Sequence, residues 1–243
     1  MIILPISDLH GILPRIERKF DLMLICGDVC PLMKQGTRFQ KDWIFHEFLD
    51  WINSLPYKDE YSKVVMVFGN HDFYGETMPY SDMSDLMGMS NTRLVILQNQ
   101  QYLFACNEGF AHIFGTPYCK IFGKWAYMVN DDILNEKFTE IPYDLDILIS
   151  HDSPTINNLG SILDWRWYNE TTGNNVLARH VKRAKPKLLF SGHFHTGNHN
   201  FEKVDETWMA NVAIVDEDYE FTHKILYVDY DANKKEVISF EYV

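Results

Sequence analysis

The chain has 243 residues, 46% of them hydrophobic and 23% charged, which is the balance of a folded domain rather than of a disordered chain. Its formal net charge of −12 at pH 7 would repel a long nucleic acid at a distance. Its uncharged apolar runs, of about five to seven residues, are too short to span a bilayer. We therefore expect neither a membrane nor a long nucleic acid as a partner.

The start of the chain and its cysteines indicate where the protein works. Met1 leads directly into the first predicted strand, without the basic segment or cleavage site of a secretory leader. Cys26 and Cys30 are expected to be small buried thiols rather than a redox or zinc pair, which fits a reducing compartment. We expect a cytoplasmic protein in which residues 1–243 form a single domain.

Five short apolar runs predict strands buried on both faces, and each is followed at once by polar side chains. The run 1–7 leads to Asp8 and His10, 20–26 to Asp28, 64–68 to Asn70, His71 and Asp72, 145–150 to His151, and 187–191 to His193 and His195. In open α/β sheets, ligands bind at the carboxyl ends of the strands. The five strand ends are therefore expected to converge on one site.

The segments between these strands predict the remaining elements. A short helix is expected at 14–19, a long crossover helix at 36–55, and a loop or weak helix at 74–88. Antiparallel strands of a second sheet or sheet half are expected at 93–97, 102–105 and 111–115, an irregular loop followed by a helix at 117–140, a helix at 174–183, and a hairpin at 224–229 and 236–242. The sum is an α/β fold of two packed sheets flanked by helices.

The polar strand ends form a mixed carboxylate, imidazole and amide set, which suits divalent Mn, Fe or Zn. Seven candidate ligands are more than one ion needs, so the set predicts two metal ions: Asp8, His10, Asp28, Asn70, His151, His193 and His195. Two such ions about 3.5 Å apart repel by roughly 20 kcal/mol at an effective dielectric of about 20, so they need an anionic bridge. Asp28 and a hydroxide are the predicted bridge, and the centre would keep a single net positive charge.

Such a centre would bind phosphate oxygens and aim the bridging hydroxide at phosphorus. His71, next to Asn70 and expected to be oriented by Asp72, is then the predicted general acid for the leaving oxygen. A buried imidazole bonded to a carbonyl remains the alternative for His71. Histidines outside the strand ends are expected at the surface or satisfied in the core, with pocket lining a minor alternative for His199: His46, His112, His180, His199 and His223.

The ordered blocks Asp8-x-His10, Gly27-Asp28, Gly69-Asn70-His71-Asp72, His151 and Gly192-His193-x-His195 resemble the calcineurin-like metallophosphoesterase superfamily. The resemblance covers nearly the whole chain and implies a four-layer sandwich of two mixed β-sheets between helices. It also implies His71 as the catalytic acid and two metal ions. One ion would be held by Asp8, His10, Asp28 and His195, and the other by Asp28, Asn70, His151 and His193.

A narrower resemblance is to the small metallophosphoesterase-domain-containing (MPPED) proteins, which are similar in arrangement to class III cyclic-nucleotide phosphodiesterases. It rests on the segments 51–57, 115–119 and 186–188. The chain departs from this pattern after His151, where it has Asp152-Ser153-Pro154 and a different loop to Gly173, which is expected to border the substrate.

The expected function is hydrolysis of a small phosphodiester, with a cyclic nucleotide as the first choice and Mn²⁺ as the first choice of metal. The superfamily's protein phosphatases carry arginines beside the Gly-Asp and Gly-Asn-His blocks, and this chain has Val29 and Phe68 there, which disfavours a dianionic phosphoprotein. The alternatives are a phosphomonoesterase or nucleotidase, and a nucleotide-binding regulator that turns over slowly.

Overall fold

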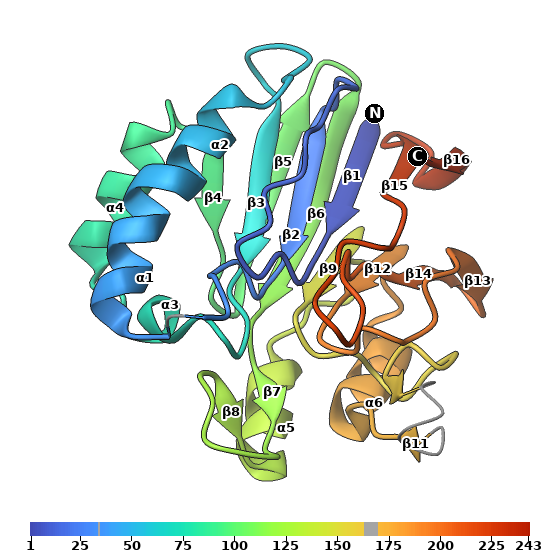
Figure 1. Ribbon diagram of the computed structural model, residues 1–243. Coiled ribbons are helices and arrows are strands. Elements are labelled where there is room, and N and C mark those ends of the chain that lie inside the picture. The colour runs from blue at the N-terminus through green and yellow to red at the C-terminus, as the bar shows by residue number, and fades with distance from the viewer. Residues whose placement is uncertain (34, 163–169) are drawn as a thin grey trace.

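The computed structural model describes residues 1–33, 35–162 and 170–243. Two six-stranded mixed sheets dominate it (Figure 1). The first has the order β16-β15-β1-β2-β3-β4, with strands β1 (Ile2–Ile6), β2 (Leu22–Cys26), β3 (Lys63–Val67), β4 (Leu94–Ile96), β15 (Leu226–Asp231) and β16 (Glu236–Tyr242). The second has the order β13-β14-β12-β9-β6-β5, with strands β5 (Gln100–Cys106), β6 (Gly109–Thr116), β9 (Ile147–Ser150), β12 (Leu188–Ser191), β13 (Glu202–Val204) and β14 (Thr207–Asn211).

The central strands are apolar on both faces because each face belongs to a different core. In β1, Ile3 packs in the cluster between the two sheets, whereas Leu4 packs in the cluster beneath the helices of the first sheet. Neighbouring side chains of a strand point to opposite faces, so a strand in this position is hydrophobic at every residue. This is why the runs at the five strands do not alternate with polar residues.

Helices cover the outer face of each sheet, so the molecule has four layers (Figure 1). On the first sheet lie α1 (Thr37–Trp43), the π-helical turn η1 (Ile44–Phe48), α2 (Leu49–Ser54), α3 (Phe73–Thr77) and α4 (Tyr80–Met89). On the second lie α5 (Asp131–Thr139) and α6 (Asn175–Ala184), whose apolar faces include Leu134, Phe138 and Leu177. The predicted fold class, two mixed sheets between helices, is confirmed.

Two expected elements are corrected by the structure. Residues 14–19 form no helix, and the Pro14 carbonyl accepts a hydrogen bond from the Trp51 indole at 3.0 Å. The strand at 93–97 is β4, and it joins the first sheet parallel to β3 instead of the second sheet. The segment expected as a loop or weak helix contains α3 and α4, which form the crossover that a parallel neighbour requires.

Short strand pairs border the site at the lower end of the sandwich. The parallel pair β7 (Cys119–Lys120) and β8 (Met128–Val129) lies beside α5, and the pair β10 (Ser161–Ile162) and β11 (Glu170–Thr171) lies near α6 (Figure 1). The middle of the loop between His151 and Gly173, residues 163–169, is outside the described residues. None of the helices in the described parts of the chain is long and apolar enough to cross a membrane.

Candidate metal centre

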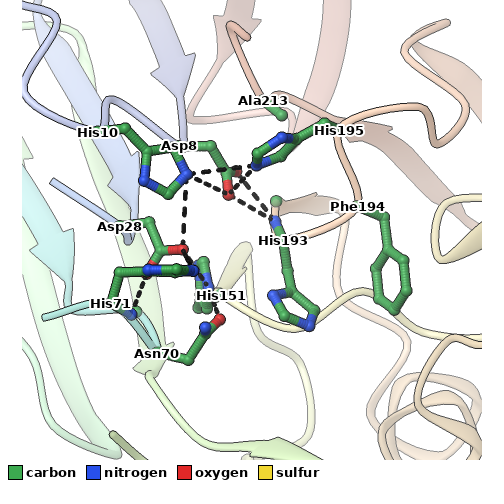
Figure 2. Close-up of polar contacts among 12 residues, drawn as sticks. Asp8, His10, Asp28, Asn70, His71, His151, His193, Phe194, His195 and Ala213 are labelled. Carbon is green, nitrogen blue, oxygen red and sulfur yellow. Dashed lines mark hydrogen bonds and ion pairs between the residues drawn. The ribbon is translucent and has the colours of Figure 1, made fainter. Parts of the chain in front are cut away.

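The candidate ligands follow the carboxyl ends of parallel strands from both sheets. Asp8 follows β1 and Asp28 follows β2 in the first sheet, while His151 follows β9 and His193 follows β12 in the second. Since the parallel strands of each sheet end at the same edge, and the two edges adjoin, the side chains meet between the sheets (Figure 2).

The backbone is bent sharply at these strand ends. Asp8, His10, Asp28 and His193 all have positive φ angles, between 44° and 70°. Residues other than glycine rarely adopt this left-handed region, and such conformations cluster at functional sites. Gly69 and Gly192 also pack closely on the site, because a Cβ at Gly69 would meet the Asp28 carboxylate and one at Gly192 would meet Asp8 and Ser7.

The first group of candidate ligands consists of Asp8, His10 and His195. One donor atom from each lies within 4.8 Å of the others. The Nε2 atoms of His10 and His195 are 3.3 Å apart, and the His195 Nε2 is 3.4 Å from Asp8 Oδ1 (Figure 2). Asp8 is fully buried, and its carboxylate accepts hydrogen bonds from the backbone N–H of His193.

The second group consists of Asp28, His151 and His193, again with donor atoms within 4.8 Å of one another. Asn70 joins it, since its Oδ1 is 2.9 Å from His151 Nε2. Asp28 also reaches the first group: its Oδ2 is 3.4 Å from His151 Nε2 and 3.8 Å from His10 Nε2. The structure thus brings all seven predicted ligands together, with Asp28 between the two groups.

The hydrogen bonds of His151 and His195 determine which ring nitrogen of each carries the proton. The Nδ1 of His151 lies 2.8 Å from the Cys26 carbonyl, and the Nδ1 of His195 lies 2.9 Å from the Asp216 carbonyl. A carbonyl only accepts, so each Nδ1 must carry the proton. In the neutral rings, each Nε2 then carries a lone pair that faces an aspartate oxygen. Two acceptors repel each other, so a cation or an added proton is needed between them. The donor set therefore fits divalent ions, and the backbone carbonyls hold the rings as they do around protein-bound metals.

The carboxylates and imidazoles of the site shift one another's pKa values. Burial alone would raise the pKa of Asp28, but the charges of His151 and His71 outweigh it and hold that pKa well below its usual range. Burial likewise opposes the protonation of His151, yet the Asp28 charge prevails and raises the His151 pKa to about 10. The pKa values of His10 and His193 fall to about 4, chiefly because burial disfavours their charged forms. The site thus favours ionised aspartates, and the Asp28 charge favours a positive charge at His151.

His71 lies at the open side of the second group. Its backbone N–H donates to Asp28 Oδ1 at 2.7 Å, and its ring Nε2 is 4.0 Å from Asp28 Oδ2. The Nδ1 is 3.3 Å from the Gln35 amide nitrogen, which can only donate, so the ring proton belongs on Nε2. Trp125 covers the other side of the imidazole, with ring centroids 4.5 Å apart.

Asp72 has a different role from the expected one. It was predicted to orient the His71 ring, but its buried carboxylate accepts hydrogen bonds from the backbone N–H groups of Gly69, Val29 and Cys30. Burial, followed by the nearby Asp28 charge, raises the Asp72 pKa to about 6. Asp72 therefore ties the loop after β2 to the loop after β3 and positions Asp28 and Asn70 indirectly.

Two further histidines contact the backbone of His195, a member of the first group. The Nε2 atoms of His199 and His223 lie 2.9 and 3.0 Å from the His195 carbonyl oxygen, and the two rings stack at a centroid distance of 3.8 Å. The His199 Nδ1 also contacts the Asn211 carbonyl. His199 therefore belongs to the support of His195 rather than to the ligand set.

A cavity of about 810 Å³ opens onto both groups. Its polar end contains Asp28, Asn70, His71, His193 and His195. The other walls are formed by residues that the sequence patterns did not single out, among them Gln35, Lys120, Ile121, Phe122, Trp125, Phe194, Glu217 and Tyr219. Of the described residues in the loop between His151 and Gly173, Asp152, Ile162 and Thr172 line the cavity. The aromatic content of 118–127 was visible in the sequence, but no spacing rule connects such a segment to a metal site.

Comparison with known proteins gives one family and several relatives. The model of the calcineurin-like phosphoesterase family matches residues 1–197. The chain is 27% identical over 218 residues to metallophosphoesterase domain-containing protein 1 of Homo sapiens, covering 79% of this chain and 60% of that protein. It thus spans less than two thirds of the length of this relative.

Solved structures share the fold at low identity. A Thermus thermophilus protein has a TM-score of 0.61 at 12% identity, with 99% of this chain and 98% of that chain covered. The phosphopantetheinyl hydrolase of Mycobacterium tuberculosis has a TM-score of 0.55 at 13% identity, with 99% and 95% covered. At these identities, the likeness concerns the fold alone.

Replacing Asp28 tests whether it joins the two groups. Asp28→Asn keeps the shape of the side chain but removes the charge that both groups share, so we expect bound Mn²⁺ to fall from about two ions per chain to one or fewer. Elemental analysis after dialysis measures this. Asp50→Asn, at an exposed position of α2, is the matched control and should keep both ions. Two retained ions in Asp28→Asn would contradict the shared role.

Metal uptake should release protons. His151 has a pKa raised to about 10 without metal, and only the neutral imidazole binds a cation, so Mn²⁺ binding at pH 7.5 should release at least one proton per chain. The affinity should therefore rise as the pH increases toward 10. Titration calorimetry in two buffers of different ionisation enthalpy counts the protons, and pH-independent binding without proton release would show that His151 is not a ligand.

Proposed function

Because the chain belongs to the calcineurin-like phosphoesterase family, we propose that it is a dinuclear metal-dependent hydrolase of small phosphodiesters, with a cyclic nucleotide as the first substrate to test. One observation carries this proposal. Two sets of buried ligand atoms lie on either side of Asp28, at one end of a cavity large enough for an organic ester.

The proposed ligands divide as the two groups do. Asp8, His10 and His195 would hold one ion, while Asn70, His151 and His193 would hold the other, with Asp28 shared between them. The mixed oxygen and nitrogen donors suit Mn²⁺ first, and Fe or Zn next. When bound, the two ions supply charge that neutralises phosphate oxygens and lowers the pKa of water.

His71 is the residue proposed to handle the leaving group. The Nε2 of His71 lies on the side of the ring toward Asp28 and the cavity. To act as an acid, the ring must carry a proton on each nitrogen, with the Gln35 amide turned so that its oxygen accepts from Nδ1. The Nε2 proton can then pass to the ester oxygen that departs from phosphorus, which leaves a neutral imidazole. The Asp28 carboxylate accepts the His71 backbone N–H, so the position of the acid is coupled to that of the shared ligand.

The charge around the cavity favours a diester over a monoester. Among the described residues that line it, the only lysine or arginine is Lys120, whose side chain is exposed, while Asp152 and Glu217 add carboxylates. A phosphate monoester carries two charges near neutral pH and is usually clamped by arginine. A singly charged diester needs less compensation, which supports this choice.

The wider setting is also proposed from charge and cysteine chemistry. Four free cysteines, three of them buried, suit a reducing cytoplasmic location. The net charge of −12 disfavours a long nucleic-acid substrate.

Removing the proposed acid should separate chemistry from metal binding. We expect His71→Ala to keep about two Mn²⁺ ions and to lower kcat by roughly 10²- to 10⁴-fold on a cyclic nucleotide, whose alkoxide leaving group needs a proton. The loss should be smaller on bis(p-nitrophenyl) phosphate, because p-nitrophenolate leaves without full protonation. His112→Ala, at an exposed position of β6, is the matched control. Unchanged kcat on both substrates would refute the assignment of His71.

A substrate panel tests the reaction class. With Mn²⁺ bound, we expect kcat/KM to be higher for bis(p-nitrophenyl) phosphate and for cyclic nucleotides than for p-nitrophenyl phosphate. The measurement is product release under one set of conditions. A preference for p-nitrophenyl phosphate would favour a monoesterase or nucleotidase, and tight nucleotide binding with no more than one turnover would favour a regulator.

A further inference from the structure

Several residues that line the cavity come from one short segment, residues 120–125, which runs from the end of β7 toward β8. Ile121 and Phe122 are 52% and 62% exposed, although both line the cavity. Exposed apolar side chains are common at protein surfaces, but at the rim of a cavity that holds reactive groups they indicate a ligand surface.

The ends of this segment are tied to the candidate metal centre. The Lys120 N–H donates to the Asp152 carboxylate at 2.9 Å, next to His151. The Ala126 N–H donates to the Asn70 carbonyl at 3.1 Å. The side chains between these anchors are therefore held at a defined place relative to the proposed ligands, and a fixed aromatic surface binds at a low entropic cost.

Two aromatic rings of the segment contact imidazoles of the site. Phe122 lies against His193 with a centroid distance of 5.3 Å, and Trp125 lies against His71 at 4.5 Å. Phe122 thus borders a proposed metal ligand and Trp125 borders the proposed acid. An ester bound at the polar end, with its leaving oxygen toward His71, would extend its organic group along these two rings.

We propose that Phe122 and Trp125 form a stacking subsite for a planar aromatic group of the phosphoester, an inference that rests on the proposed phosphoesterase function. The segment then selects substrates by their organic group, while the metal centre binds the phosphate. Lys120, at the start of the segment, adds a positive charge at the rim for the anion. The ligand class is an aryl or nucleoside phosphoester rather than an alkyl or sugar phosphate.

Equilibrium binding to the Mn²⁺-bound protein tests the subsite without relying on turnover. The probes are phenylphosphonate and methylphosphonate, which share the charged group and resist hydrolysis. We expect the wild-type protein to bind the phenyl compound about tenfold more tightly, since an aromatic contact of this kind is worth up to about that factor. Phe122→Ala should reduce this preference to about twofold and leave the methylphosphonate affinity unchanged.

Two variants control the experiment. Phe122→Tyr keeps the ring and should keep the preference. Phe110→Ala removes a phenylalanine of β6 that is 51% exposed and does not line the cavity, and it should also keep the preference. The pair AMP and ribose 5-phosphate extends the test, because a larger preference for AMP than for phenylphosphonate would identify a nucleobase as the aromatic group.

The outcomes separate the subsite from the function on which it rests. Equal binding of both phosphonates by the wild-type protein, or a phenyl preference that persists in Phe122→Ala, would overturn the subsite and leave the phosphate site standing. Binding of neither phosphonate would overturn both proposals. Loss of methylphosphonate affinity in Phe122→Ala would show that Phe122 supports His193 rather than an aromatic ligand.

Discussion

The structure depends on the placement of ionised aspartates in a buried seam between two sheets. Asp8 and Asp28 are almost completely buried, and they face imidazole nitrogens whose lone pairs point at the same space. Uncompensated, two carboxylates in such surroundings would cost several kcal/mol each. The Asp28 charge raises the pKa of His151, and divalent ions would supply positive charge at the same place. The fold thus holds the two carboxylates close together in a site that favours a bound cation.

The surrounding structure fixes the positions of the carboxylates and imidazoles. Strands from both sheets end at the seam, and left-handed backbone turns the chain sharply at four of the ligands: Asp8, His10, Asp28 and His193. Backbone carbonyls of Cys26 and Asp216 fix the imidazoles of His151 and His195. Asp72 joins the loops after β2 and β3, while His199 and His223 hold the backbone at His195. Each of these groups acts on a ligand through the main chain or through a second hydrogen bond.

Sequence reasoning found the side chains that the structure brings together because each follows closely after a strand. An apolar run that ends in Asp, Asn or His predicts a strand and places the polar side chain at its carboxyl end. This holds for Asp28 as well as for His193. The same reasoning failed where tertiary contacts decide the conformation. Residues 14–19 form no helix, and the Pro14 carbonyl contacts Trp51 of α2. Strand β4 lies in the first sheet, because α3 and α4 provide the crossover that a parallel neighbour of β3 requires.

Residues that act from loops could not be found in this way. Gln35, Phe122 and Trp125 reach the site only through the folding of long connections, and nothing in their spacing links them to it. The role expected for Asp72 was wrong for a related reason, since adjacency to His71 in sequence does not place its carboxylate near the ring. The local sequence pattern therefore predicted the candidate ligands, whereas the residues that line the rest of the cavity could be identified only from the three-dimensional structure.

The central claim is that these residues enclose two metal ions on either side of Asp28. Anomalous diffraction from crystals grown with Mn²⁺, recorded on both sides of the manganese absorption edge, tests it most directly. The account predicts two peaks, one contacting Asp8, His10 and His195, the other contacting Asn70, His151 and His193, with Asp28 touching both. A single peak, or peaks away from these side chains, would contradict it.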